Sequence, residues 1–304
     1  ILSFRPDAEY FYPASLVKLP LALLLLEKIS QGTIPRLSLK SRLIIERSEK
    51  RGCRATMEEL LEQMLVVSDN HAYSCLFHFL GAASVARAIR GKDLPVVLAR
   101  PFGEEAGESP AVRVFSQSRL IFALGQLRYS LPEKKQTIPI GRAHYDGSAF
   151  SSRPMDFGNE NHLPLQTVHE LLMDTYSKKP RYFVLGPDEK HFLHVRLRLP
   201  PAGIRHNRGH FRCNAEFKYF FRNQPCLNLP AGLEVSSKAG RAYGFLSDSA
   251  RIRDKQTDQA FFLTAGLYVN ANEILNDDRY EYEELGWPAL YALGQAFTRA
   301  FREP

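Results

Sequence analysis

The sequence predicts a mixed α/β (α+β) fold, in which a sheet with flanking helices comes from the chain ends and a helical lobe lies between them. Three observations predict it. An apolar helix begins near Ser15, a capped helix begins at Thr56, and a buried strand at 260–269 precedes a closing helix that begins near Pro288. With 304 residues, the chain is long enough for one large domain or two small ones.

The first predicted helix follows Ser15 and ends near Gly32. Residues 19–26 are apolar on every side, which is typical of a helix buried in the core. Pro20 is tolerated there because backbone N–H groups at a helix start lack partners anyway. The apolar run is too short to cross a bilayer. The residues before Ser15 leave room for little more than one strand.

The second predicted helix begins at a capping box formed by Thr56 and Glu59. Apolar residues at helical spacing then extend to Leu65. We therefore expect the helix to end just before Ser68, so that residues 68–70 lie on a loop.

Four later segments complete the prediction. Residues 161–172 are typical of a capped helix, and residues 195–199 alternate like a half-exposed strand. Residues 260–269 are typical of a buried strand. In the closing helix, one apolar face is formed by Leu290, Leu293, Phe297 and Phe301.

Three short motifs follow one another along the chain: Ser15-Leu16-Val17-Lys18, then Ser68-Asp69-Asn70, then Lys238-Ala239-Gly240. Each is weak alone, because Ser15 could be a helix N-cap beside a solvated Lys18. The second motif alone could be a simple turn. All three in this order are hard to obtain by chance, so the motifs together indicate a catalytic site.

The motifs suit nucleophilic catalysis by a serine. A serine hydroxyl needs a nearby base, and residues three apart on a helix share a face, so Lys18 can reach Ser15. Lysine acts as a base only when burial or other cations lower its pKa, and the positive charge of Lys238 could contribute to lowering the pKa of Lys18. Ser68 could relay a proton to the leaving group, and Asn70 could bind a substrate amide. No cofactor and no metal is implied.

The three motifs resemble the S-x-x-K, S-D-N and K-T-G set of class A serine β-lactamases and penicillin-binding proteins. The resemblance covers about residues 9–80 and 230–304. It implies a β-lactamase/transpeptidase-like fold, with an antiparallel sheet and flanking helices plus an all-α lobe, and the site at their junction. We expect the α/β lobe to comprise residues 1–14 and 178–304, and the mainly helical lobe residues 15–177.

The resemblance also implies a role for each motif residue. The catalytic residues would be Ser15, Lys18, Ser68 and Lys238, and the substrate-binding residues Asn70, Ala239, Gly240 and Arg241. The backbone amides of Ser15 and Arg241 would form the oxyanion hole, and Lys238 would also attract a substrate carboxylate. The third motif departs from the pattern, because Ala239 stands where threonine is usual.

A second departure concerns deacylation. Class A β-lactamases carry a glutamate in an E-x-x-L-N pattern, which activates the hydrolytic water. Glu104 falls at about the right distance after Ser68, but the Leu-Asn is absent. Glutamates on a glycine-rich loop are more often solvated than catalytic. Without that base, an acyl-enzyme would form and persist.

These observations leave three functions open. The first is a serine acyl-transfer hydrolase of β-lactamase type, in which Ser15 attacks a β-lactam or related amide. The second is a DD-peptidase, penicillin-binding protein or esterase with slow deacylation. The third is a non-catalytic cell-wall-binding protein that keeps the fold. The 170 residues between Ser68 and Lys238 also indicate two insertions, at 110–153 and 180–225.

Charge and cysteine content bear on the partners. The net charge is +7, and residues 178–222 hold 11 Lys and Arg against 3 Asp and Glu. Aromatics interleave this stretch as in a nucleic-acid groove, but a half-exposed strand at 195–199 would explain the arginines, so we expect no nucleic-acid partner. We expect a monomer that acts on a β-lactam or a peptidoglycan-type peptide in the periplasm or outside the cell. Four cysteines make no disulfide framework, although Cys213 and Cys226 could pair.

Overall fold

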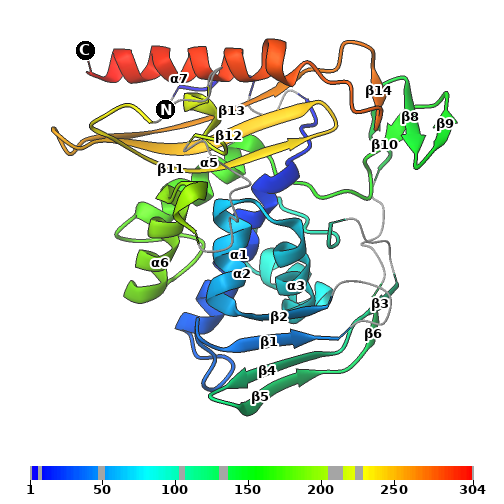
Figure 1. Cartoon of the computed structure of the whole chain (residues 1–304), viewed down its shortest axis with the longest axis vertical. Helices are drawn as coiled ribbons and strands as arrows, with labels where there is room; N and C mark the ends of the chain where they lie inside the picture. The colour runs from blue at the N-terminus through cyan, green and yellow to red at the C-terminus, as the bar shows by residue number, and fades with distance from the viewer. Residues whose placement is uncertain are drawn as a thin grey trace.

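The computed structural model describes residues 2–5, 9–46, 52–102, 107–129, 136–204, 215–222 and 229–302. It confirms the predicted fold class, because an antiparallel sheet carries helices on both faces (Figure 1). The longer helices are α1 (Lys18–Ser30), α2 (Met57–Val66), α3 (Asn70–Leu80), α4 (Ala82–Arg90), α5 (Leu165–Tyr176), α6 (Pro187–Arg198) and α7 (Trp287–Arg302). The short turns are the 3-10 helices η1 (Ala14–Val17), η2 (Pro201–Gly203) and η4 (Tyr219–Phe221), and the π-helix η5 (Tyr282–Gly286).

The strands form several antiparallel sheets of different size. They are β1 (Arg42–Ile45), β2 (Cys53–Thr56), β3 (Gly107–Ser109), β4 (Val112–Ser116), β5 (Arg119–Leu124), β6 (Leu127–Tyr129), β7 (Pro139–Ile140), β8 (Ala143–Asp146), β9 (Ala149–Ser151), β10 (Met155–Asp156), β11 (Leu233–Ala242), β12 (Phe245–Asp254), β13 (Ala260–Tyr268) and β14 (Ile274–Leu275). One pairing is parallel, that of β14 with β8.

The main sheet is the antiparallel set β11-β12-β13, and the predicted strand at 260–269 is confirmed as β13. Successive residues of a strand point to opposite faces, and β13 shows this at Phe261 and Phe262. Phe261 packs on Phe301 of α7, whereas Phe262 packs on His169 of α5. The two helices therefore cover opposite faces of the sheet, as Figure 1 shows.

Helix α1 is the centre of the largest hydrophobic core. Every residue from Leu19 to Glu27 is buried, as the all-round apolar pattern predicts. Helices α2, α3, α5 and α6 contribute residues to the same core. The predicted capping box is confirmed at the start of α2, where Thr56 Oγ1 accepts a hydrogen bond from the Glu59 N–H and the Glu59 carboxylate accepts one from the Thr56 N–H.

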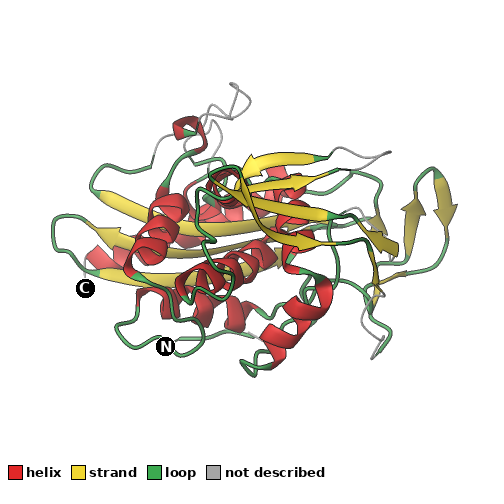
Figure 2. Cartoon of the chain, turned by 90° about the horizontal axis from the view of Figure 1, so that it is seen from below, coloured by secondary structure: helices red, strands yellow, loops and turns green. Residues whose placement is uncertain are grey.

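The second lobe contains strands as well as helices. The sheet β2-β1-β4-β5 lies at the far end of the molecule from α7 (Figure 1). Figure 2, a view from below, shows strands lying in front of helices. The expectation of an all-α lobe is therefore incomplete. Strands such as β1 have only four residues, and their alternation of buried and exposed side chains is too short to stand out in the sequence. The division into lobes at residues 14/15 and 177/178 stays a prediction.

The predicted strand at 195–199 is wrong, because these residues continue α6 and its C-cap. Leu193 and Leu197 are four residues apart and both buried, so helical packing decides over the local alternation. The predicted helix at 161–172 exists, but it begins later, at Leu165 after Pro164.

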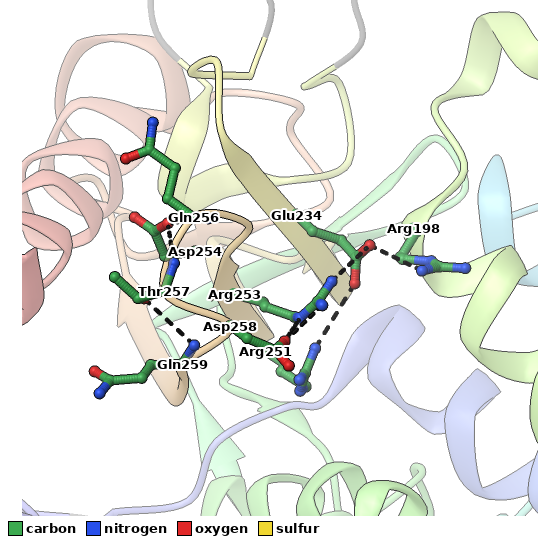
Figure 3. A network of polar contacts seen from close by, with 9 residues as sticks. All are labelled: Arg198, Glu234, Arg251, Arg253, Asp254, Gln256, Thr257, Asp258 and Gln259. Carbon is green, nitrogen blue, oxygen red and sulfur yellow. Dashed lines mark hydrogen bonds and ion pairs between the residues drawn. The ribbon is translucent and has the colours of Figure 1, made fainter.

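An ion-pair network attaches α6 to the sheet (Figure 3). Glu234 of β11 accepts from Arg198 of α6 at 2.8 Å and lies 3.8 Å from Arg251 and 3.7 Å from Arg253. Arg253 also pairs with Asp258 at 2.5 Å. Several of the positive charges near the end of the sheet are therefore paired with acids.

Among the described residues, no single helix is long and apolar enough to span a membrane. Helices α3 and α4 together have the length and apolar composition of a span, but they are bent by 81° relative to each other. Cys213 and Cys226, whose pairing the sequence leaves open, lie outside the described residues, and Cys53 and Cys75 are buried.

Candidate active site

Ser15 lies in η1, a turn that leads directly into α1. The neighbouring side chains of Leu16 and Val17 are fully buried, and the Leu16 N–H donates to the Pro13 carbonyl at 2.9 Å. Ala14 has φ +45°, a left-handed conformation that non-glycine residues rarely adopt. These contacts hold Ser15 half-buried at the start of the helix. The alternative that Ser15 is a helix N-cap is wrong, because the cap of α1 is Val17.

Lys18 is the residue that the sequence predicts as the base for Ser15, and the structure places it beside the serine. Its Nζ lies 2.8 Å from Ser15 Oγ, and it donates to the Ser68 carbonyl at 2.5 Å and to Asn70 Oδ1 at 2.6 Å. These two oxygens can only accept, so they take both N–H groups of a neutral amine. The nitrogen lone pair is then left for a hydroxyl proton.

The surroundings of Lys18 favour the neutral amine. The side chain is fully buried, which excludes the alternative of a solvated lysine. Burial lowers the pKa of Lys18 well below its ordinary value, the nearby Lys238 lowers it further, and Asp69 opposes the shift. Lys18 is thus arranged to accept the proton of Ser15.

Ser68 and Asp69 of the second motif lie on the loop between α2 and α3, as predicted, whereas Asn70 is already the first residue of α3. Ser68 has φ +57°, and Asp69 caps α3 by accepting from the Ala72 N–H at 2.6 Å. Asp69 therefore holds the loop in place. Asn70 is exposed at the start of α3, with its side-chain oxygen bound to Lys18, so its amide nitrogen is the group that can face a substrate.

Lys238 of the third motif completes the cluster. Its Nζ donates to Ser68 Oγ at 2.9 Å, and Lys18 Nζ lies 3.2 Å from the same oxygen. Burial lowers the pKa of Lys238 to about 7, Asp248 opposes this shift and Lys218 adds to it. The Ser68 hydroxyl thus connects two lysines whose pKa values are both lowered.

Gly240 is where β11 passes against the serine turn. A Cβ atom at this position would lie 2.6 Å from the Pro13 carbonyl oxygen and 3.2 Å from the Ser15 amide nitrogen. Only glycine fits such a close approach. The next residue is Arg241, whose amide is the second predicted donor of the oxyanion hole.

The side chains of Ala239 and Arg241 turn away from the serine. Ala239 packs in the core between the sheet and α7, so only its backbone can contribute to the site. The Arg241 guanidinium carbon lies 5.3 Å from the Trp287 ring and 5.4 Å from the Tyr282 ring, and the side chain is exposed. Its charge is therefore held against two aromatic rings at the rim.

Comparisons with known proteins agree with the fold. Residues 4–117 match the family model described as the Beta-lactamase enzyme family. A PBP-A variant, solved as an acyl-enzyme complex with penicillin G, is 16% identical, with 98% of this chain and 85% of that chain covered and a TM-score of 0.57. This chain has the β-lactamase fold. The resemblance drawn from the three motifs is thereby confirmed.

Two further solved structures share the β-lactamase fold with this chain. A class A β-lactamase from Bacteroides cellulosilyticus DSM 14838 is 14% identical over 95% of this chain and 83% of its own, with a TM-score of 0.55. The β-lactamase from Streptomyces albus G is 17% identical over 97% and 88%, with a TM-score of 0.54. No curated protein sequence matches the chain.

One predicted residue of this β-lactamase fold lies outside the described residues, namely Glu104. The described residues instead bring Phe102 to the site. Its ring centroid is 5.0 Å from Lys18 Nζ and 4.8 Å from the ring of the fully buried Tyr73. Sequence reasoning missed both aromatic residues. The one feature that could have indicated Phe102 is its position two residues before Glu104.

Proposed function

We propose that this protein is a serine acyl-transfer enzyme, in which Ser15 attacks a β-lactam or a related amide and forms an acyl-enzyme. The observation that carries the proposal is the 2.8 Å contact between Ser15 Oγ and the fully buried Lys18 Nζ. A lysine buried among acceptors with a second lysine nearby is held as a neutral base, which is what a serine nucleophile requires.

The acylation step follows from these positions. Lys18 takes the proton of Ser15 as Oγ bonds to the carbonyl carbon, and the Ser15 and Arg241 amides would stabilise the resulting oxyanion. The amide nitrogen leaves with a proton from the Ser68 hydroxyl, which lies between Lys18 and Lys238 and can be reprotonated by either. Lys238, when protonated, would attract a substrate carboxylate.

We propose further that deacylation is slow, as in a penicillin-binding protein or DD-peptidase. Hydrolysis of the ester needs a base that activates water beside the acyl group. Among the described residues, the ring of Phe102 lies against Lys18, and the hydrogen-bond partners of Lys18 are Ser15, Ser68 and Asn70 rather than a carboxylate. This observation favours a persistent acyl-enzyme over rapid β-lactamase turnover.

The non-catalytic alternative has less support. Two lysines that are almost fully buried carry a desolvation cost, and that cost favours their replacement in a protein that needs only the fold. Here Lys18, Lys238, Ser68 and Asn70 instead form one hydrogen-bonded cluster around Ser15.

Intact-protein mass spectrometry after addition of a penicillin tests the proposal, with Ser15→Ala as the control. The expected result is a Ser15-dependent adduct that persists for minutes or longer. An adduct that disappears within seconds would indicate an efficient β-lactamase. The same adduct in the Ser15→Ala variant, or none in the wild type, would overturn the proposal.

Substrate and location remain part of the proposal. A peptidoglycan-type peptide is the natural substrate class that a slow acyl-enzyme of this fold suggests, and a periplasmic or secreted location would bring the enzyme to it. Acylation by a D-Ala-D-Ala ester and cell fractionation test these two points.

A further inference from the structure

Ala239, which stands where threonine is usual in the third motif, lies beside the buried carboxylate of Asp248. In the register of β11 and β12, Ala239 lies opposite Asp248, and the two residues are 2% and 0% exposed. Directly opposed residues on one face have Cβ atoms only about 4.5–5.5 Å apart. Because residue 239 carries only a methyl group, no larger side chain occupies the space beside the carboxylate.

Asp248 has few hydrogen bonds for a buried carboxylate. Its Oδ2 accepts from the Phe220 N–H at 3.4 Å, and its Oδ1 has no hydrogen-bond partner among the described residues. A buried charge of this kind requires compensation by nearby charges of opposite sign. Two lysines, Lys218 and Lys238, supply them, since both act electrostatically on Asp248.

Lys218 belongs to the same buried group. It is 4% exposed and donates to the Leu197 carbonyl at 2.9 Å. A cavity of about 10 Å³, lined among others by Lys218, Ser237 and Lys238, lies between the two lysines. This is room for about one water molecule.

The three charged groups titrate in the same range. Burial raises the pKa of Asp248 to about 7, and Lys218 and Lys238 oppose that shift. Burial lowers the pKa of Lys218 to about 8 and that of Lys238 to about 7. At Lys238, the charge of Asp248 favours the ammonium form and the charge of Lys218 disfavours it.

We propose that Asp248 and Lys218 are positioning residues that set the charge of Lys238 during acylation. The inference rests on the proposed function, in which protonated Lys238 attracts the carboxylate of the substrate. The charge of Asp248 favours the ammonium form of Lys238, and the charge of Lys218 favours the neutral form.

Other charged groups surround this cluster and stay unchanged in the variants below. They are Lys18 of α1, Asp69 before α3, Arg196 of α6, and Glu216, Arg222 and Arg241 around Tyr219. They are the same in every variant, so they do not distinguish the variants from one another.

The first test is the pH profile of the acylation rate by a penicillin. The rate is expected to fall as pH rises through the pKa of Lys238, near 7 in the wild type. Asp248→Asn is expected to shift this alkaline midpoint down by about one pH unit, and Lys218→Met to shift it up by about one. The matched control is Ser237→Ala, a buried uncharged change beside the same cavity, which is expected to leave the midpoint in place.

Either variant decides the question if the other fails to fold. Unchanged midpoints, or shifts of the same sign in both variants, would overturn the inference, because a merely structural role lowers the rate without moving the midpoint in opposite directions.

A second test needs no acylation. With lysines labelled at 13Cε, the resonance of Lys238, assigned by its loss in Lys238→Met, reports the pKa directly as pH is varied. If the pKa of Lys238 shifts in opposite directions in Asp248→Asn and Lys218→Met but no acylation is detected, the inference about the charge of Lys238 is supported and the proposed function is wrong. If both variants are acylated normally and the pKa of Lys238 is unshifted in both, the inference about the charge of Lys238 is wrong and the proposed function is unaffected.

Discussion

The ring of Phe102 lies 5.0 Å from Lys18 Nζ, against an amine that also contacts Ser15, Ser68 and Asn70. A ring in this place excludes water from the side of Lys18 that it covers. It contributes to the burial that keeps Lys18 neutral, and it provides no base for hydrolysis of an ester on Ser15. Under the proposed function, Phe102 would therefore favour acylation and supply no base for deacylation.

Replacing this ring with a carboxylate is expected to shorten the lifetime of the acyl-enzyme. In Phe102→Glu, a base would stand within reach of the ester, and general bases contribute about 100-fold or more to such steps. We expect loss of the penicillin adduct at least about tenfold faster than in Phe102→Gln, which has nearly the same shape without the charge. Equal loss rates in the two variants, followed by mass spectrometry, would show that the carboxylate is not used.

Lys18→Met is expected to lower the acylation rate by about 100-fold to 10,000-fold. The variant keeps an apolar stem of similar length but removes the group that accepts the Ser15 proton. Stopped-flow measurement with a chromogenic cephalosporin gives the rate. The control is Lys40→Met, which removes an exposed lysine from the loop after α1. A rate in Lys18→Met within a few-fold of the control would assign the base to another group.

Gly240→Ala is expected to reduce acylation by at least about 100-fold through a steric effect on the serine turn. Its Cβ would stand 2.6 Å from the Pro13 carbonyl oxygen, so either β11 or the turn must move, and the Ser15 amide with it. Gly125→Ala is the matched control, because nothing lies within 4 Å of a Cβ placed there. Similar rates in both variants would mean that the oxyanion hole tolerates the displacement.

The parts of this protein that sequence reasoning predicted are those in which a local pattern and the tertiary structure agree. The apolar run after Ser15 lies in a buried helix, and the box at Thr56 caps α2. The three motifs meet around Ser15 because each is placed by such an element, with Lys18 on α1 and Lys238 on β11.

The parts that sequence reasoning missed depend on contacts between distant segments. Val195 to Leu199 alternates like a strand, yet packing of Leu193 and Leu197 against the core makes the segment helical. Nothing local in the sequence places Phe102 against Lys18, or the methyl group of Ala239 opposite Asp248. These pairings follow from sheet register and from loop paths, which one sequence does not reveal.

The lowered pKa of Lys238 also predicts how stability depends on pH. The folded-state pKa is about 7, below the ordinary value of 10.5 that applies when the chain is unfolded. Between these values the unfolded chain binds more protons than the native protein, so the free energy of unfolding contributed by Lys238 rises with pH. The limiting slope is about 1.4 kcal/mol per pH unit for one proton.

Urea unfolding of the wild type and of Lys238→Met between pH 7 and 9 measures this contribution as a difference, in which groups that do not interact with Lys238 cancel. We expect the wild-type free energy of unfolding to rise more steeply than that of the variant, by up to about 1.4 kcal/mol per pH unit. Lys255→Met, at an exposed turn, is expected to run parallel to the wild type. Parallel curves for Lys238→Met as well would mean that Lys238 stays protonated up to its ordinary pKa. In that case Lys238 would stay an ammonium near neutral pH, which attracts a substrate carboxylate but is a weaker proton donor to Ser68 than an ammonium with a pKa near 7.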